Sequence, residues 1–507
     1  MTTQASIDAD DLRHIGYQQE LHRRLGAFSS FAAGFSFVSI LTTVFQLFAL
    51  GYSFGGPAFF WTWPLVFAGQ LCVALVFAEL AASWPLAGCI YQWSRRLVGE
   101  TVGWFAGWAM LVGYIVSVAA IGIALQAVLP AVWSGFQVVG TDPSITSASG
   151  AANGILLGSV LIALATVISA VGVRFMALIN GIGVTCELIG VVLLLVLLFG
   201  HAERGPGVVT ETLNVSGKGP YLSAFLASTL MAAYVMYGFD SAAELAEETS
   251  QPRRVVPSAI LRALLVSFVG GGFMIVAALM AAPSLTDGQL STGGIAYVIT
   301  SQLNSTLGRA LLAVVAISIV SACLAIQNSA SRVMFSMARD GRLPGARFLA
   351  RVSPQTGTPI LTGIAVGVLA IAILLINLGN PAAFAAVTST SVVVVYLAYL
   401  LVTVPALGAR LSGRLPAKPH GGFSLGRWGL PVNLFAMVYG VAMMVNIAWP
   451  RQAVYDPAGT SWVLQYLALL FVAALVVLGA VLHRLLRRDA AAGADAGAAA
   501  VEAQAGL

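Results

Sequence analysis

Twelve apolar runs, each long enough to cross a lipid bilayer, constrain what this chain can fold into. A helix crosses the ~30 Å hydrocarbon core with about 20 apolar residues, and its backbone polar groups pair within the segment. We therefore predict an all-α polytopic membrane protein with twelve transmembrane helices. The runs lie at 28–50, 58–82, 102–129, 153–172, 178–200, 222–243, 259–282, 308–336, 359–377, 382–409, 431–449 and 463–486.

The composition excludes a soluble protein. Apolar residues make up 59% of the 507 residues and charged residues only 9%, whereas soluble domains carry roughly 25% charged residues. The net charge of +5 therefore does not indicate a nucleic-acid partner. No nucleotide-binding motif appears, and the histidines and cysteines do not cluster, so we expect no cofactor, no metal site and no enzyme activity.

The basic residues predict the orientation. If the N-terminus is cytoplasmic, the external segments hold only Arg204, Lys218, Arg309 and Arg451 of the 25 Lys and Arg residues. Because cytoplasmic segments are enriched in Lys and Arg, we expect a multi-pass protein of the cytoplasmic membrane with both termini cytoplasmic. Residues 1–27 form the cytoplasmic N-terminal segment, and the Ala- and Gly-rich residues 487–507 are expected to be a disordered cytoplasmic tail.

Three acidic residues, Glu79, Glu187 and Asp240, lie inside apolar runs. An ionisable group there is costly unless it lines a cavity or has a partner. Glu79 is near the end of its run and is interpreted as structural. Glu187 is in the middle of its run and has no basic residue nearby in the sequence. It is either a neutral carboxylic acid bonded to another helix or an ion-coupling residue that carries H⁺ or binds Na⁺.

Two of the runs contain residues that disfavour a continuous helix. The first run, 28–50, holds Ser39, Thr42 and Thr43 near its middle, and the sixth holds Gly238 and Asp240 beside Tyr234 and Tyr237. Small residues also allow close helix packing. A pair of interrupted helices at corresponding positions, however, is typical of an inverted-repeat transporter with a midplane site, where aromatic faces can cover an ammonium group.

Three long motifs carry a resemblance to a known family. They are AELAASWPLAGCIYQWSRRLVG (78–99), GFDSAAELAEETSQPRRVVPSAI (238–260) and SRVMFSMARDGRLPGARFLARVSPQTGTPI (331–360). The chain resembles the amino acid–polyamine–organocation transporters, most of all the amino acid/choline branch with its 4-aminobutyrate permeases. The resemblance covers roughly residues 25–410.

This resemblance implies a 5+5 inverted repeat of the leucine-transporter type, with the transport core at 28–410 and two peripheral helices at 431–486. It places the break of helix 1 at LTTVF (41–45) and the break of helix 6 at YVMYGFD (234–240). It also places Glu187 where many relatives carry a lysine, and Tyr234 as an aromatic gate. The implied substrate-binding residues are Ser39, Leu41, Thr42, Thr43, Tyr114, Tyr234, Tyr237, Gly238 and Asp240. For Tyr114, packing in the core is the alternative.

Charges of both signs in the last two motifs have two interpretations. The resemblance implies a cytoplasmic gate latched by ion pairs, and ordinary solvated charges are the alternative. The gate residues are Glu247, Glu248, Arg253, Arg339 and Asp340.

We therefore expect a secondary-active permease that moves an amino acid or related organic amine by alternating access. The expected partners are an amino acid, 4-aminobutyrate, polyamine or choline-like substrate, H⁺ or Na⁺, and the lipid bilayer. H⁺ symport is the first hypothesis, and Na⁺ symport or exchange is the second. An ion channel or a sensor is a weaker alternative.

Overall fold

The apolar runs form helices in the computed structural model, which describes residues 4–145, 147–215, 220–379, 381–416, 422–456, 459 and 461–505. Eleven helices in this part of the chain are long and apolar enough to cross a membrane. The described residues contain no β-strand beyond one isolated bridge between Leu25 and Thr249. The all-α polytopic fold class is confirmed.

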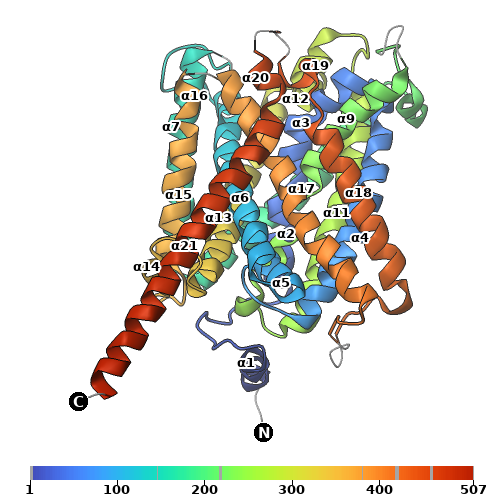
Figure 1. Ribbon diagram of the computed structural model, residues 1–507. Coiled ribbons are helices and arrows are strands. Elements are labelled where there is room, and N and C mark those ends of the chain that lie inside the picture. The colour runs from blue at the N-terminus through green and yellow to red at the C-terminus, as the bar shows by residue number, and fades with distance from the viewer. Residues whose placement is uncertain are drawn as a thin grey trace.

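The helices follow the predicted runs closely along the bundle (Figure 1). The α-helices are α1 Gln4–His14, α2 Ala27–Val38, α3 Ile40–Gly55, α4 Thr62–Ser83, α5 Cys89–Val98, α6 Glu100–Val132, α7 Ala148–Val171, α8 Val173–Gly200, α9 Tyr221–Val235, α10 Ser241–Glu244, α11 Pro252–Ala281, α12 Gly288–Gln302, α13 Ser305–Arg339, α14 Ala346–Leu349, α15 Ile360–Leu374, α16 Ile376–Gly379, α17 Pro381–Leu411, α18 Gly429–Ala448, α19 Gln452–Tyr455, α20 Trp462–Gln465 and α21 Leu467–Ala505. The 3₁₀ helices are η1 Pro57–Trp61, η2 Ser134–Phe136, η3 Pro206–Thr210, η4 Ala246–Glu248 and η5 Gly426–Trp428.

The sixth predicted run, 222–243, contains no helix long enough to be counted among the eleven. It forms the 15-residue helix α9, then an irregular segment, then the four-residue helix α10. By length alone α9 is too short to be counted with the eleven spanning helices. The interruption falls at the glycine and aspartate that the sequence marks as poor helix formers.

Helix α21 continues through the C-terminal segment to Ala505. Alanine has the highest helix propensity of all residues, and this segment is rich in it. A disordered cytoplasmic tail at residues 487–507 stays a prediction.

Polar side chains fix where several helices begin. The Ser147 hydroxyl accepts a hydrogen bond from the Gly150 N–H at the start of α7, at 3.0 Å. The Asn304 amide oxygen accepts from the Leu307 N–H at the start of α13, at 2.9 Å. Such caps satisfy backbone donors that have no partner within the helix.

Burial separates a central group of helices from peripheral ones. In the segments Ala27–Gly55, Ser305–Arg339 and Ser391–Leu411, 72% of the most apolar window is buried. The corresponding values for Gly426–Ala448 and Leu467–Arg488 are 28% and 17%. Helices α18 and α21 therefore lie at the edge of the bundle, where exposed apolar side chains such as Val445 and Leu478 face the position of lipid.

Small residues bring the central helices into close contact. A Cβ atom on Gly158 of α7 would lie 3.0 Å from a backbone atom of Gly122 on α6. Such backbone approach maximises van der Waals contact, which holds helices together in a membrane. Helix α1 and the C-terminal end of α21 lie at one end of this bundle, called the lower end below (Figure 1).

Candidate functional site

The first interruption separates α2 from α3 at a single residue. Ser39 adopts the left-handed conformation, with φ +39° and ψ +74°. This conformation costs a residue with a side chain roughly 1–2 kcal/mol. The break therefore precedes the predicted position at 41–45, because Leu41, Thr42 and Thr43 already belong to the first turn of α3.

Hydrogen bonds at the break compensate for this strained residue. The Ser39 hydroxyl lies 2.8 Å from Thr42 Oγ1 and 3.1 Å from Glu187 Oε1. The Thr43 hydroxyl donates to the carbonyl oxygens of Val38 and Ser39 at 3.0 and 2.9 Å. It thus satisfies acceptors that the end of α2 leaves free.

Glu187 of α8 is fully buried beside this break. Its Oε1 also accepts a hydrogen bond from the Leu41 N–H at 3.2 Å, so the carboxyl group caps the start of α3. Helix N-termini favour negative groups because their first N–H groups are unpaired. Glu187 Oε2 is buried and has no hydrogen-bond partner among the described residues, so half of the carboxyl group remains available to a proton or a cation.

The second interruption lies between α9 and α10. Gly238 has φ +87°, and a Cβ atom there would lie 1.8 Å from a ring carbon of Phe37. Only glycine combines this backbone conformation with so close an approach. Asp240 is the next polar residue and precedes the first turn of α10.

Asp240 is fully buried and is held by two tyrosines. The Tyr114 hydroxyl of α6 donates to Asp240 Oδ2 at 2.7 Å, and the Tyr399 hydroxyl of α17 donates to Oδ1. Tyr399 also accepts from the Gly238 N–H at 3.0 Å. These contacts fix the irregular segment and give it a carboxylate lined by aromatic rings.

The two interruptions meet in space. The Ser241 hydroxyl of α10 donates to the Ala33 carbonyl of α2 at 2.9 Å. The ring of Phe37 on α2 lies 5.1 Å from the ring of Tyr114 and 5.8 Å from that of Tyr237. An aromatic cluster therefore joins the irregular segments, and the Tyr237 hydroxyl lies 3.3 Å from Ser117.

Tyr234 lies outside this cluster of contacts. It belongs to α9, and its hydroxyl is 3.3 Å from the Tyr455 hydroxyl of α19. The structure thus brings together eight of the nine predicted binding residues around the two breaks and places Tyr234 against an outer loop helix.

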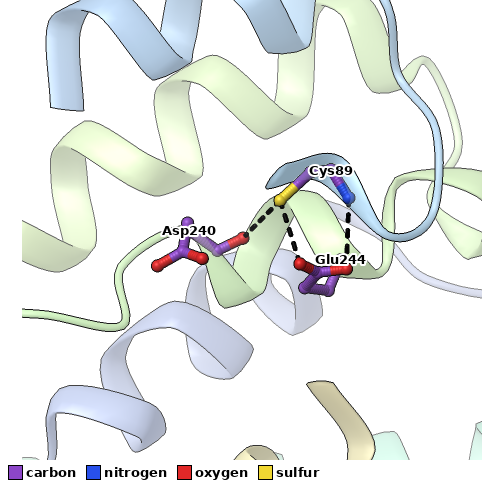
Figure 2. A group of neighbouring side chains, drawn as sticks. All are labelled: Cys89, Asp240 and Glu244. Atoms are coloured by element: carbon purple, nitrogen blue, oxygen red, sulfur yellow. Dashed lines mark hydrogen bonds between the residues drawn. The ribbon is translucent and has the colours of Figure 1, made fainter. Parts of the chain in front are cut away.

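Asp240 also belongs to a buried group with Cys89 and Glu244 (Figure 2). Glu244 lies one turn further along, and its two oxygens accept from the Cys89 thiol at 3.1 Å and the Cys89 N–H at 3.2 Å. One ligand-type atom from each of Cys89, Asp240 and Glu244 lies within 4.8 Å of the other two. Because the polar side-chain atoms of these three residues already have protein partners, we interpret the group as a hydrogen-bonded network. The carboxyl groups of Asp240 and Glu244 lie close together in it.

Ion pairs connect the predicted gate residues at the lower end. Glu247 pairs with Arg339 at 2.8 Å and Asp340 pairs with Arg95 at 2.7 Å. Glu248 forms a fully buried pair with Arg332 at 3.0 Å. These pairs join η4 to α13, and α13 to α5.

The N-terminal segment covers these pairs. Arg253 pairs with Asp11 of α1 at 2.9 Å. The Tyr17 hydroxyl donates to Asp340 at 3.0 Å, and the Arg339 guanidinium lies 4.2 Å from the Tyr17 ring centre. Burial, and then the Asp340 carboxylate, raises the pKa of Tyr17, so its hydroxyl remains a hydrogen-bond donor.

Glu79 lies in a different environment. It pairs with Arg410 and accepts from the Leu425 N–H at 3.0 Å. It thereby joins α4 to the segment that follows α17.

Several residues of this site escape sequence reasoning. Phe37, Cys89, Ser117, Glu244, Arg332 and Tyr399 hold the breaks or the acids. The sequence places only three acids in apolar runs, yet Glu244, Glu247 and Glu248 are fully buried as well. A run of AELAEE looks like a solvated loop, and burial comes from chain segments far away in the sequence. The motif at 238–260 contains all three acids, and the resemblance names Glu247 and Glu248 as gate residues. For Glu244 the signal is its position four residues after Asp240.

Comparison with known proteins gives consistent similarities along the chain. The family model described as amino acid permease matches residues 25–476. The amino-acid permease BAT1 of Arabidopsis thaliana is 27% identical over 87% of this chain and 88% of its own. Its homolog in Oryza sativa is also 27% identical, over 87% of each chain. Amino-acid permease 2 of Neurospora crassa is 26% identical over 92% of this chain and 86% of its own.

Proposed function

Since the chain belongs to the amino acid permease family, we propose that it is a secondary-active transporter of an amino acid or related organic amine. Membership of this family indicates a transporter rather than an enzyme. The observation that carries the proposal is the meeting of two interrupted helices, α2/α3 and α9/α10, at one buried site. Interrupted helices at the repeat interface form the midplane site of alternating-access transporters.

The two sides of this site suit the two charged groups of an amino acid. Asp240 and the rings of Phe37, Tyr114 and Tyr237 suit an ammonium group by charge and cation–π attraction. The N–H groups at the start of α3 suit a carboxylate. We therefore expect a substrate that carries an ammonium group. A carboxylate on the same molecule would distinguish an amino acid from a simple amine.

Glu187 supports H⁺ coupling through competition for the same donors. As a carboxylate it accepts from the Ser39 hydroxyl and the Leu41 N–H. Once protonated it is a weaker acceptor, and both donors become available to a substrate carboxylate. Proton uptake and substrate binding would then favour each other, which is the requirement for symport.

Na⁺ coupling is the second candidate for the same residue. Glu187 Oε2 is buried without a hydrogen-bond partner among the described residues, and carboxylate oxygens are ligands for hard cations. Exchange of one amine for another needs neither ion and is the third candidate.

The ion pairs at the lower end support a gate on the side where the termini lie. We expect the pairs Glu247–Arg339, Glu248–Arg332 and Asp340–Arg95 to separate when the site opens toward that side. The positive-inside distribution of arginines supports the proposal that this side is cytoplasmic.

A ligand screen tests the proposal. Purified protein is heated with single amino acids, 4-aminobutyrate, polyamines, choline and ethanolamine, because binding raises the unfolding temperature by mass action. We expect one class to stabilise the protein and to show counterflow in liposomes. If compounds stabilise it but no counterflow occurs, the protein binds these ligands without carrying them. A channel shows conductance without counterflow.

A further inference from the structure

A groove between α2 and α8 opens on the outer surface at the lower end of the bundle. Its volume is about 510 Å³, within the range of about 300–1,000 Å³ that small-molecule sites occupy. The lining residues come from the segment before α2, from α2 and from α8. They are Arg24, Phe28, Ser29, Arg174, Ala177, Leu178, Gly181, Ile182, Thr185 and Cys186.

Two arginines stand at one end of this groove. Arg24 precedes the start of α2 by three residues, and Arg174 is the second residue of α8. Both are exposed, and neither guanidinium pairs with a carboxylate within the part of the chain that the structure describes. Arginines at the ends of spanning helices lie at the level of lipid headgroups, so two unpaired positive charges meet at that level.

The rest of the groove is an apolar stripe. Arg174, Leu178, Gly181, Ile182 and Thr185 recur at helical spacing on one face of α8. From residue 174 to residue 186 this face extends about 18 Å. Phe28, Leu178 and Ile182 are more than half exposed, and Gly181 leaves the middle of the groove open. The stripe thus continues from the arginines into the depth of the lipid chains.

From this charge and shape we propose that the groove binds an anionic phospholipid of the adjacent leaflet. Its phosphate would lie between Arg24 and Arg174, and one acyl chain would lie along Leu178, Gly181 and Ile182. Basic pockets between spanning helices suit anionic headgroups. A free phosphate would use the arginines but not the stripe.

The site also links two helices. Helix α2 is only 12 residues long and ends at the strained Ser39. A phosphate held by Arg24 before α2 and by Arg174 on α8 would tie the two helices together.

Lipid retention by the purified full chain tests the proposal. Wild-type protein and R24Q/R174Q are titrated with phosphatidylglycerol or phosphatidylcholine, and retained lipid is counted by native mass spectrometry. Each surface arginine contributes about a factor of five to anionic lipid binding, so the double variant is expected to lose about twenty-five-fold in phosphatidylglycerol affinity. The matched control R254Q/R347Q removes two exposed arginines outside the groove. It is expected to retain the wild-type affinity for phosphatidylglycerol.

A steric variant separates the groove from charge alone. A Cβ atom on Gly181 would lie 3.4 Å from the Phe28 ring, an ordinary contact, and a leucine would fill the space beyond it. Gly181→Leu keeps both arginines and is expected to lose phosphatidylglycerol retention.

Three results of the lipid titrations would overturn the proposal. They are equal retention by wild type and R24Q/R174Q, equal loss in R254Q/R347Q, and equal affinity of wild type for the two lipids. Competition with inorganic phosphate tests whether the site binds a free anion, which would also overturn the proposal. If millimolar phosphate alone displaces the lipid, the site recognises a soluble anion and not a phospholipid.

Discussion

At the scale of single residues, the proposed transport chemistry depends on two buried carboxyl groups, Glu187 and Asp240. Among the described residues, Glu187 accepts hydrogen bonds from the Ser39 hydroxyl and the Leu41 N–H, and Asp240 accepts from two tyrosine hydroxyls. A buried carboxyl group without a cation is costly when ionised. Protonation or an arriving cation would relieve this cost.

Glu187→Gln tests the coupling role. Glutamine retains a hydrogen-bond acceptor for Leu41 but cannot exchange a proton, so substrate binding is expected to persist while concentrative uptake falls to equilibration. Uptake into liposomes under an imposed pH gradient, with thermal shift as the binding readout, measures both. Full pH-dependent accumulation by this variant would show that Glu187 does not carry the coupled proton.

Tyr234→Ala tests the predicted aromatic gate. A cation–π contact contributes about 0.5–2 kcal/mol, so the variant is expected to raise KM for uptake roughly tenfold if Tyr234 covers the substrate. Tyr455→Phe is the matched control, because it removes only the hydroxyl that faces Tyr234. Unchanged uptake kinetics in Tyr234→Ala would assign Tyr234 to packing against α19.

At the scale of elements, the site is made by two helices that stop and restart. Helix α2 ends at Ser39, which adopts the left-handed conformation. Gly238, also at positive φ, lies in the irregular segment between α9 and α10. Each interruption exposes backbone groups in the middle of the bundle, where Glu187 of α8 accepts from the Leu41 N–H and Tyr399 of α17 accepts from the Gly238 N–H. The remaining groups are available to a ligand.

Gly238→Ala tests whether this interruption is required. The added methyl group overlaps the Phe37 ring, and overpacking costs about 1–3 kcal/mol. The left-handed backbone adds about 1–2 kcal/mol. The free energy of unfolding is therefore expected to fall by about 2 kcal/mol or more. Gly408→Ala is the control, because nothing lies within 4 Å of a Cβ there. Equal stability of the two variants would contradict the close packing of the breaks.

At the scale of the whole molecule, distant segments close the lower end. Residues of α1, Tyr17, η4, α5 and the end of α13 form a layer of ion pairs and hydrogen bonds. The exposed pair Arg13–Asp10 contributes little, because water screens it. The buried pair Glu248–Arg332 has no such screening, and loss of one partner leaves a charge in the interior.

Arg332→Gln tests the buried pair. Breaking such a pair costs about 3–5 kcal/mol, and the thermal unfolding temperature is expected to fall accordingly. Arg13→Gln is the control and is expected to change stability by less than about 1 kcal/mol. In the double variant E248L/R332M no charge remains buried, so most of the loss is expected to be regained. If it is not, the hydrogen bond from Arg332 to the Asn328 amide oxygen carries the stability.

The sequence by itself determined the membrane-spanning helical class and the region of each interruption. Length and hydropathy specify spanning helices because lipid leaves a backbone no other local solution, and Gly238 with Asp240 disfavours helix locally. The tertiary structure alone decided that Glu187 caps α3, that Tyr399 holds Asp240 and that Glu244 and Arg332 are buried. Those contacts join residues more than 80 positions apart. No local pattern encodes them, because burial and partners depend on how the helices pack.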